Sequence, residues 1–167
     1  MADPQQPLGE TRQFLSFSVG KEEYAVDIMT IREIRGWTET TRLPGSPPYM
    51  RGVMNLRGLI IPIFDLRTRL QQGTTEVTPR HVVVILAVAA RTVGLLVDAV
   101  SDILDISDEQ IRPAPAEPRE PGDSLGSSTD AAFIDGLLSL QGRMVVLLNV
   151  ERLFDVRQID KAVSQAA

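Results

Sequence analysis

The sequence predicts a mainly β protein, built as two five-stranded β-barrels in one compact chain with a few short helices. Apolar residues alternate with polar ones over short runs, which is the pattern of half-buried strands. Turn residues separate these runs at close spacing, and no apolar pattern is long enough for a long helix. Small barrels suit short strands because closure of the sheet hides its edges.

The first predicted strands form a hairpin close to the N-terminus. Residues 13–19 alternate apolar side chains with serines, a turn follows at 20–22, and residues 24–27 continue as the partner strand. This alternation predicts a strand with one face on the core and one face in solvent.

A short helix or turn is expected after this hairpin. Ile28, Ile31 and Ile34 recur at every third position, which is a helical spacing. Residues 37–43 are then predicted to be extended, because threonine is common there and favours strands.

A second hairpin is predicted over residues 52–56 and 59–64, with a turn between them. Pro62 has no backbone donor, so its strand is expected at the edge of a sheet. Asp65 is a suitable N-cap for a short helix over residues 66–70.

The second half of the chain repeats this alternation of strands and turns. Residues 82–88 and 94–97 are apolar on both faces, which predicts deeply buried strands. An extended segment over residues 100–106 follows. The last hairpin and its short helix are expected at residues 137–140, 144–149 and 150–154.

Two parts of the sequence resemble each other and indicate an internal repeat. Residues 55–66 match residues 139–150 at an offset of 84, and both contain Leu-x-Gly, an apolar strand, an Asp or Asn cap and a short helix. Residues 25–27 match residues 96–98 at an offset of 71. An insertion of 13 residues within the loop at 113–130 would explain the difference, so we predict two copies of one unit of about five strands.

Composition limits the possible function. The 167 residues are 43% hydrophobic and 23% charged, which is typical of a globular chain that buries its own core. The absence of cysteine excludes disulfides and thiolate metal ligands. The net charge of −5 and the scattered basic residues argue against nucleic acid and against an anionic membrane. The longest apolar run, residues 82–90, is far shorter than the roughly 20 residues of a membrane span.

No catalytic or metal-binding pattern stands out. His81 is the only histidine, and it is expected to be an ordinary residue at a strand end. Asp102 and Asp105 lie on a predicted strand with opposite orientations, so they do not form a carboxylate pair. The sequence also lacks a nucleophile elbow and a phosphate-binding loop. These observations favour an interaction protein over an enzyme.

Two features suit an interaction surface. The isoleucines at positions 28, 31 and 34 bracket Arg32 and Glu33, and they would serve a core or an interface equally well. Arg57 lies beside Gly58 in a predicted hairpin turn, where most arginines are simply solvated. Arginine is nevertheless enriched at the hot spots of interfaces, because its guanidinium group makes paired hydrogen bonds.

Several short motifs occur together and in order over residues 13–154. They are EYAVDI with REIRG, RGVMNLRG followed by IIPI and DLR, VDAVSD, EQIRP, and GRM with NVE. In this combination the sequence resembles the CheW family of chemotaxis coupling proteins. It departs from the family in the length and proline content of the loop at 113–130, and its tail after residue 156 has no recognised motif.

The resemblance implies two SH3-like five-stranded barrels, no catalysis and no cofactor. Proteins of this family bridge the cytoplasmic tip of methyl-accepting chemoreceptors and the homologous regulatory domain of the histidine kinase CheA. Their kinase contact is barrel against barrel and largely apolar. The resemblance therefore implies a cytoplasmic adaptor, monomeric in isolation, that is recruited to receptor arrays at the inner face of the membrane without inserting into it.

The resemblance also assigns candidate contact residues. Arg57 and Glu33 match positions that are implicated in receptor or assembly contacts. Ile28 and the apolar positions around it are assigned to the kinase contact. Three further positions are expected at the receptor groove: Ile31, Gly52 and Val100.

The expected organisation is a disordered segment over residues 1–12, a CheW-like domain of two barrel lobes over residues 13–155, and a helical or frayed tail over residues 156–167. Within the domain, a mobile loop is expected from Pro113 to Asp130, where Pro, Gly, Ser and Asp are frequent.

Two alternatives to a chemotaxis adaptor stay open. The first is a CheW-like adaptor of a non-flagellar chemosensory pathway, which sequence alone does not separate from flagellar chemotaxis. The second is a β-barrel that binds a small molecule or nucleic acid, for which a basic and aromatic-rich groove would be expected. The net charge of −5 and the eight aromatic residues count against that second alternative.

Overall fold

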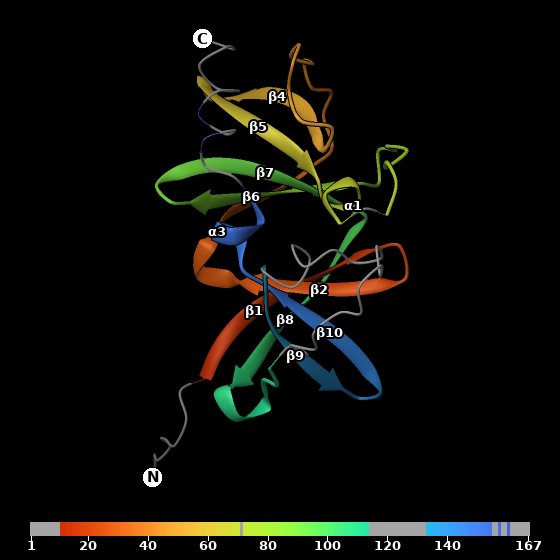
Figure 1. Ribbon diagram of the computed structural model, residues 1–167, viewed down its shortest axis with the longest axis vertical. Coiled ribbons are helices and arrows are strands. Elements are labelled where there is room, and N and C mark those ends of the chain that lie inside the picture. Colours follow the sequence, from red (N-terminus) through yellow and green to blue (C-terminus); the bar gives the residue numbers. More distant parts are fainter. Residues whose placement is uncertain (1–10, 71, 114–132, 155–156, 158–159, 161–167) are drawn as a thin grey trace, which may run out of the picture.

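The computed structural model describes residues 11–70, 72–113, 133–154, 157 and 160. Its strands form two five-stranded sheets, which lie one above the other in Figure 1 with a short helix, α3, between them. We call the upper sheet barrel 1. Its strand order is β3-β6-β7-β5-β4, and its strands are β3 (Ile31–Gly36), β4 (Met50–Leu56), β5 (Leu59–Asp65), β6 (Val82–Val88) and β7 (Arg91–Val97).

Barrel 2 combines strands from both ends of the chain. Its order is β8-β1-β2-β10-β9, and its strands are β1 (Thr11–Val19), β2 (Glu22–Asp27), β8 (Ala99–Ser107), β9 (Ile134–Leu140) and β10 (Arg143–Leu148). The N-terminal hairpin thus completes the C-terminal barrel through a parallel pairing of β2 with β10 (Figure 1). The prediction of a mainly β chain with two five-stranded units is confirmed.

The two barrels have the same topology, which confirms the internal repeat. Each contains one parallel pair, β5 with β7 in barrel 1 and β10 with β2 in barrel 2. Each barrel is also closed by a single bridge. Thr41, which follows β3, pairs with Val53, and Arg112, which follows β8, pairs with Leu137. These two bridges are related by the offsets of 71 and 84 residues that the sequence shows. The additional 13 residues fall between β8 and β9, as expected.

Short helices follow the strands at equivalent places. Helix α1 (Leu66–Arg69) and helix α3 (Val150–Leu153) begin after β5 and β10. The Asp65 side chain accepts a hydrogen bond from the Arg67 backbone N–H, and the Asn149 side chain caps α3 in the same way. Two 3₁₀ turns, η1 (Ile28–Thr30) and η2 (Asp108–Gln110), end the hairpin β1–β2 and strand β8.

Three apolar clusters explain why many strands are buried on both faces. One lies inside barrel 1 and includes Ile61 and Ile85, and one lies inside barrel 2 and includes Phe14 and Leu147. The third and largest contains residues of both barrels, such as Phe17, and fills the space between them. We call it the central cluster. The two barrels therefore share the largest of the three apolar clusters.

Polar contacts also join the barrels. The Asp98 carboxylate accepts hydrogen bonds from the Gly20 backbone N–H of barrel 2 (2.8 Å) and from Nη2 of Arg67 of barrel 1 (2.7 Å). Arg69 donates through Nε to the Leu153 carbonyl oxygen at 2.7 Å. Its guanidinium group lies over the rings of both Tyr49 and Phe133, at 5.4 and 5.0 Å from their centres.

The structure corrects three local predictions in or near the first hairpin. The isoleucine spacing does not produce a helix beyond η1, because Ile31 and Ile34 already belong to strand β3. Residues 37–43 contain no strand, and only Thr41 pairs with another strand. Ser16 was expected to face solvent, but it is fully buried and donates its hydroxyl to the Asp102 carbonyl oxygen.

The prediction of an edge strand at Pro62 is wrong. Strand β5 lies between β4 and β7. Pro62 faces Val53 of β4, but the Val53 N–H and C=O both bond to Thr41 on the other side. The parallel pairing of β5 with β7 begins only at Ile63. Proline is therefore tolerated in an interior strand because neither neighbour requires its N–H at this position.

Three expectations of domain organisation fall largely outside the described residues. They concern the N-terminal segment, the loop after Pro113 and most of the tail. Strand β1 begins at Thr11, two residues before the expected start of the domain. Among the described residues, no helix is long and apolar enough to cross a membrane.

Candidate interaction site

Glu33 and Arg57 meet on the surface of barrel 1. Arg57 in the β4–β5 turn forms an ion pair with Glu33 of β3, and Arg35 donates to the other carboxylate oxygen of Glu33 at 3.0 Å. The Arg57 side chain is 69% exposed. The structure thus brings together the two residues that the resemblance singled out, and it adds Arg35, which was not predicted.

The β4–β5 turn holds Arg57 in a fixed position. The backbone of Arg57 is left-handed, with a φ of 52°, and Gly58 follows with a φ of 88°. Positive φ angles at two successive residues are typical of tight hairpin turns. The Asn55 side chain accepts a hydrogen bond from the Gly58 N–H at 2.8 Å. A defined turn reduces the freedom that Arg57 would lose on binding a partner.

The electrostatics of this cluster favour a charged Glu33. Hydrogen bonds from Arg57, and then from Arg35, lower the pKa of the Glu33 carboxyl below its ordinary value. Two guanidinium groups therefore share one carboxylate, and the cluster keeps a net positive charge. Ion pairs between side chains at the surface contribute little to stability, so this cluster is not a major part of what holds the fold together.

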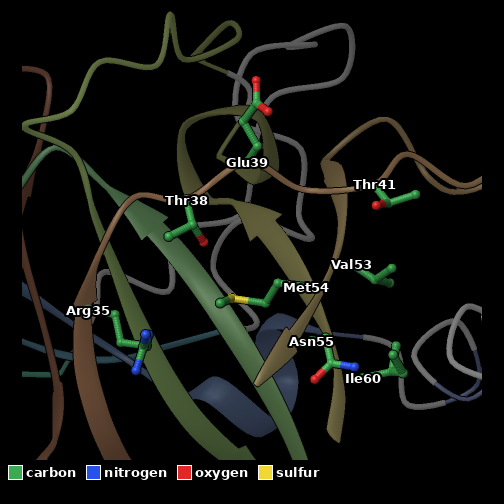
Figure 2. A pocket seen from close by; sticks show the side chains of 8 residues that line it. All are labelled: Arg35, Thr38, Glu39, Thr41, Val53, Met54, Asn55 and Ile60. Atoms are coloured by element: carbon green, nitrogen blue, oxygen red, sulfur yellow. The ribbon is translucent and has the colours of Figure 1, made fainter. Parts of the chain in front are cut away.

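A pocket of about 380 Å³ lies next to this cluster, between β3 and β4. We call the gap between these strands the seam of barrel 1. One end of the seam is closed by the Thr41–Val53 bridge, and the other end is spanned by the Glu33–Arg57 ion pair. Figure 2 shows the lining side chains, which come from β3, β4, β5 and the irregular segment after β3.

The equivalent gap in barrel 2 is filled. We call the gap between β8 and β9 the seam of barrel 2. Leu104 is the equivalent of Glu33 and packs against the apolar cluster of barrel 2, together with Ile111 and Leu140. Gln141 takes the place of Arg57 and also has a positive φ, of 49°. The charged cluster is therefore a property of one barrel.

The other predicted receptor contacts lie deeper. Ile31 and Val100 are half-buried and pack against the central cluster from the two barrels. Gly52 is buried beside the closing bridge, where a Cβ atom would lie 2.4 Å from the Thr41 carbonyl oxygen. The glycine is thus required by packing, and its contact with a partner stays a prediction.

The predicted kinase contact, Ile28, lies in the 3₁₀ turn η1 and is half-buried. Its neighbour Met29 is 86% exposed and is the more accessible apolar side chain. Asp27 holds this turn by accepting hydrogen bonds from the Met29 N–H and, through its carbonyl oxygen, from the Thr30 hydroxyl. Periodicity did not reveal Met29, because the turn is too short to have a pattern.

His81 lies at a strand end, as expected. Its Nδ1 accepts a hydrogen bond from the Thr78 N–H at 3.0 Å, and its Nε2 faces Asp98 at 3.4 Å. Within the part of the chain that the structure describes, no group of three or more His, Asp or Glu residues could hold a metal ion.

The family follows from comparison with known proteins. The model of the CheW-like domain matches residues 13–158. This chain belongs to the CheW-like family. Its similarity to a probable chemotaxis protein CheW of Rhizobium etli is 43% identity over 151 residues, which covers 90% of this chain and 92% of that protein. The chemotaxis protein CheW of Rhizobium meliloti is 42% identical over the same shares of the two chains.

A solved structure supports the fold. The crystal structure of the scaffolding protein TtCheW from Thermoanaerobacter tengcongensis is 28% identical, with a TM-score of 0.76. The match covers 89% of this chain and 96% of that one. The two sheets of the chain are therefore the two SH3-like barrels of the CheW fold, as the resemblance implied, and the chain is an adaptor of the chemotaxis type.

Proposed function

We propose that this protein couples methyl-accepting chemoreceptors to the histidine kinase CheA without catalysis of its own. It binds the cytoplasmic tip of the receptor and the regulatory domain of the kinase, and it works in the cytoplasm at receptor arrays. Membership of the CheW-like family supports this role, as do relatives named for chemotaxis and scaffolding.

The observation that carries the proposal is the cluster of Glu33, Arg35 and Arg57 at the surface of barrel 1, in which Glu33 and Arg35 are partly buried and Arg57 is exposed. Its charges contribute little to folding, yet the hairpin turn and the shared carboxylate hold them in a defined geometry. We assign Arg57 and Glu33 to the receptor contact. Met29 and Ile28 supply an apolar contact for the kinase on the turn η1.

The test is a binding measurement with the purified full chain. Its partners are a receptor signalling fragment and the regulatory domain of a CheA-type kinase from the same cell. Arg57→Ala should fold normally and weaken receptor binding by about tenfold, the effect of losing an interface hot spot. Met29→Asp should weaken kinase binding instead, since it places a charge in an apolar contact.

The control is Arg80→Ala, which removes an exposed arginine elsewhere on barrel 1. Absence of saturable binding to either partner at tens of micromolar would contradict the adaptor role. Loss of folding in Arg57→Ala would instead make Arg57 a structural residue.

The pathway is a separate question, and an adaptor of a non-flagellar chemosensory pathway stays a candidate. Relatives of the chain are not restricted to proteins named CheW, because Protein FrzA of Myxococcus xanthus is 26% identical over 144 residues. The same binding measurement against the receptors and kinases of each pathway in the cell would identify the cognate pair.

A further inference from the structure

Asp98 lies at the point where the chain passes from barrel 1 to barrel 2. It follows β7 of barrel 1 and precedes β8 of barrel 2. Its backbone N–H donates to the Ser18 carbonyl oxygen of barrel 2 at 2.9 Å. Oδ2 of its side chain accepts hydrogen bonds from Gly20 of barrel 2 and from Arg67 of barrel 1. A change at this carboxylate therefore acts on both barrels.

The other carboxylate oxygen of Asp98 faces His81. Oδ1 is buried and accepts no hydrogen bond from any residue that the structure describes. Nε2 of His81 lies 3.4 Å away, whereas a charged N–H···O bond is about 2.7 to 2.9 Å long. The His81 side chain is only 14% exposed. The two groups are therefore close enough for a small shift to convert their contact into a hydrogen bond.

The turn before β6 fixes the other side of the imidazole ring. The Thr78 backbone N–H donates to Nδ1 of His81 at 3.0 Å, so the neutral ring carries its proton on Nε2. A second proton must go to Nδ1, and the Thr78 N–H then loses its acceptor. The Thr78 hydroxyl lies 3.1 Å from Nδ1 and can accept the new proton instead. Protonation therefore changes the turn at residues 78–81 and the contact with Asp98 together.

The charge of Asp98 is constant over the range in which histidines titrate. Burial opposes its ionisation, but hydrogen bonds from Gly20 and Arg67 outweigh burial and lower the pKa of the Asp98 carboxyl below its ordinary value. Asp98 is therefore charged between about pH 5 and 8, where a histidine changes its charge. The side chains of Lys21 and Arg80, on the two adjoining turns, are exposed and form no ion pair within the described residues.

We propose that His81 and Asp98 form a pH-sensitive switch at the junction of the two barrels. When His81 takes a second proton, its Nε2–H becomes a charged donor and closes on Oδ1 of Asp98, while the Thr78 N–H leaves Nδ1. When that proton is lost, the longer contact and the Thr78 hydrogen bond return. The junction, and with it the placement of one barrel against the other, thus depends on pH. This inference goes beyond the proposed adaptor function and does not rest on it.

Nuclear magnetic resonance of the full chain between about pH 5 and 8 tests the switch. His81 is the only histidine, so a single imidazole signal reports its titration. The amide signals of Thr78 and Gly20 should shift with the same midpoint, although Gly20 belongs to the other barrel. His81→Gln keeps a neutral N–H donor and cannot titrate, so both amide signals should lose this shift in that variant.

Two variants change the charge that His81 meets, in opposite directions. Asp98→Asn removes the carboxylate and should lower the midpoint of the imidazole titration by about half a pH unit. Arg67→Met removes the guanidinium group that shares this carboxylate and should raise the midpoint by a similar amount. Arg80→Met is the matched control, because Arg80 is adjacent to His81 in sequence but exposed, and it should move the midpoint by less than about 0.2 unit.

Two results would overturn the proposal. If the imidazole titrates but the Gly20 amide signal does not follow it, protonation is not felt in barrel 2 and there is no switch. An unchanged midpoint in folded Asp98→Asn would show that His81 and Asp98 are not coupled. Thermal unfolding confirms that each variant is folded, and if Asp98→Asn is not, Arg67→Met and the Gly20 signal of the wild type decide. The adaptor role is tested separately by the binding measurement.

Discussion

The two barrels share one topology but differ at their seams. In barrel 1 the gap lies between β3 and β4, and in barrel 2 it lies between β8 and β9. A single bridge crosses each gap, Thr41 with Val53 in barrel 1 and Arg112 with Leu137 in barrel 2. The seam of barrel 2 is packed with apolar side chains such as Leu104. The seam of barrel 1 keeps a pocket and an exposed ion pair.

This difference shows which part of a duplicated unit is free to change. Several apolar positions inside one barrel have apolar equivalents in the other, for example Ile61 and Val145. The seam positions are only partly buried, so each barrel can stabilise a different side chain there: Leu104 packs against the apolar cluster of barrel 2, and Glu33 is held by two arginines in barrel 1. A second copy of a barrel can therefore take a new contact while the fold is kept.

The largest expected effect tests whether the backbone beside the closing bridge excludes a side chain equally strongly in the two barrels. Gly52→Ala should lower the free energy of unfolding by about 3 kcal/mol, because the backbone has a φ of 145° and the Thr41 carbonyl oxygen lies 2.4 Å from the new Cβ. Gly136→Ala in barrel 2 should cost less, about 2 kcal/mol, because its φ is not positive and the equivalent backbone contact, with the Arg112 carbonyl oxygen, is longer at 2.9 Å, although Ile111 Cγ2 lies at 2.5 Å. Urea unfolding measures both.

Two further glycines serve as controls for this prediction. Gly45→Ala, at a φ of 76° in open space, reports the backbone strain alone, and Gly36→Ala has neither strain nor a close neighbour. Equal losses at Gly52 and Gly45 would show that the approach of Thr41 is irrelevant.

The next largest effect tests whether the seam of barrel 2 tolerates a glutamate at the position that corresponds to Glu33 of barrel 1. Leu104→Glu should cost about 2 kcal/mol, because it removes apolar packing and places a carboxylate without an arginine partner at the edge of the core. Ile103→Glu is the matched control, since Ile103 is 50% exposed and should lose less than about 0.5 kcal/mol. If the two variants lose the same stability in chemical denaturation, the seam of barrel 2 is not a packed region.

The sequence was sufficient to predict most strands and their arrangement in two repeated units. Alternation and short apolar runs located the strands except β3, and the two offsets located the repeat and the place of the insertion. The exchange of the N-terminal hairpin into barrel 2 was not predicted, because the parallel pairing of Tyr24 with Val146 joins distant segments and leaves no local pattern. The prediction that the strand of Pro62 lies at a sheet edge was wrong for the same reason, since only the neighbouring strands decide whether the missing N–H matters.

The candidate site was predicted only in part. Glu33 and Arg57 came from the motifs of the family, whereas Arg35 and the pocket depend on the irregular path of residues 37–43. Threonine-rich sequence there was interpreted as a strand. Irregular backbone has no period to detect, so sites built on it are seen only in three dimensions.

The smallest expected effect concerns the junction of the two barrels and uses the equivalent acids Asp98 and Asp27. Burial alone would raise the pKa of Asp98, but hydrogen bonds from the Gly20 N–H and from Arg67 outweigh it and lower the pKa. A carboxylate with a lowered pKa stabilises the fold fully above its unfolded pKa, near 4, and loses this contribution as the pH falls through its folded pKa.

Asp98→Asn should therefore cost about 1 to 2 kcal/mol at pH 7, because charged hydrogen bonds between the barrels are lost, and the difference from the wild type should narrow below about pH 4. Asp27→Asn should cost less, since the Asp27 side chain bonds within its own turn and lies 3.9 Å from Arg12 of the same barrel. Unfolding curves between pH 3 and 7 decide this. An equal, pH-independent loss for both variants would mean that the hydrogen bonds of Asp98 do not help to join the barrels. Asp98 would then be a surface acid like its counterpart.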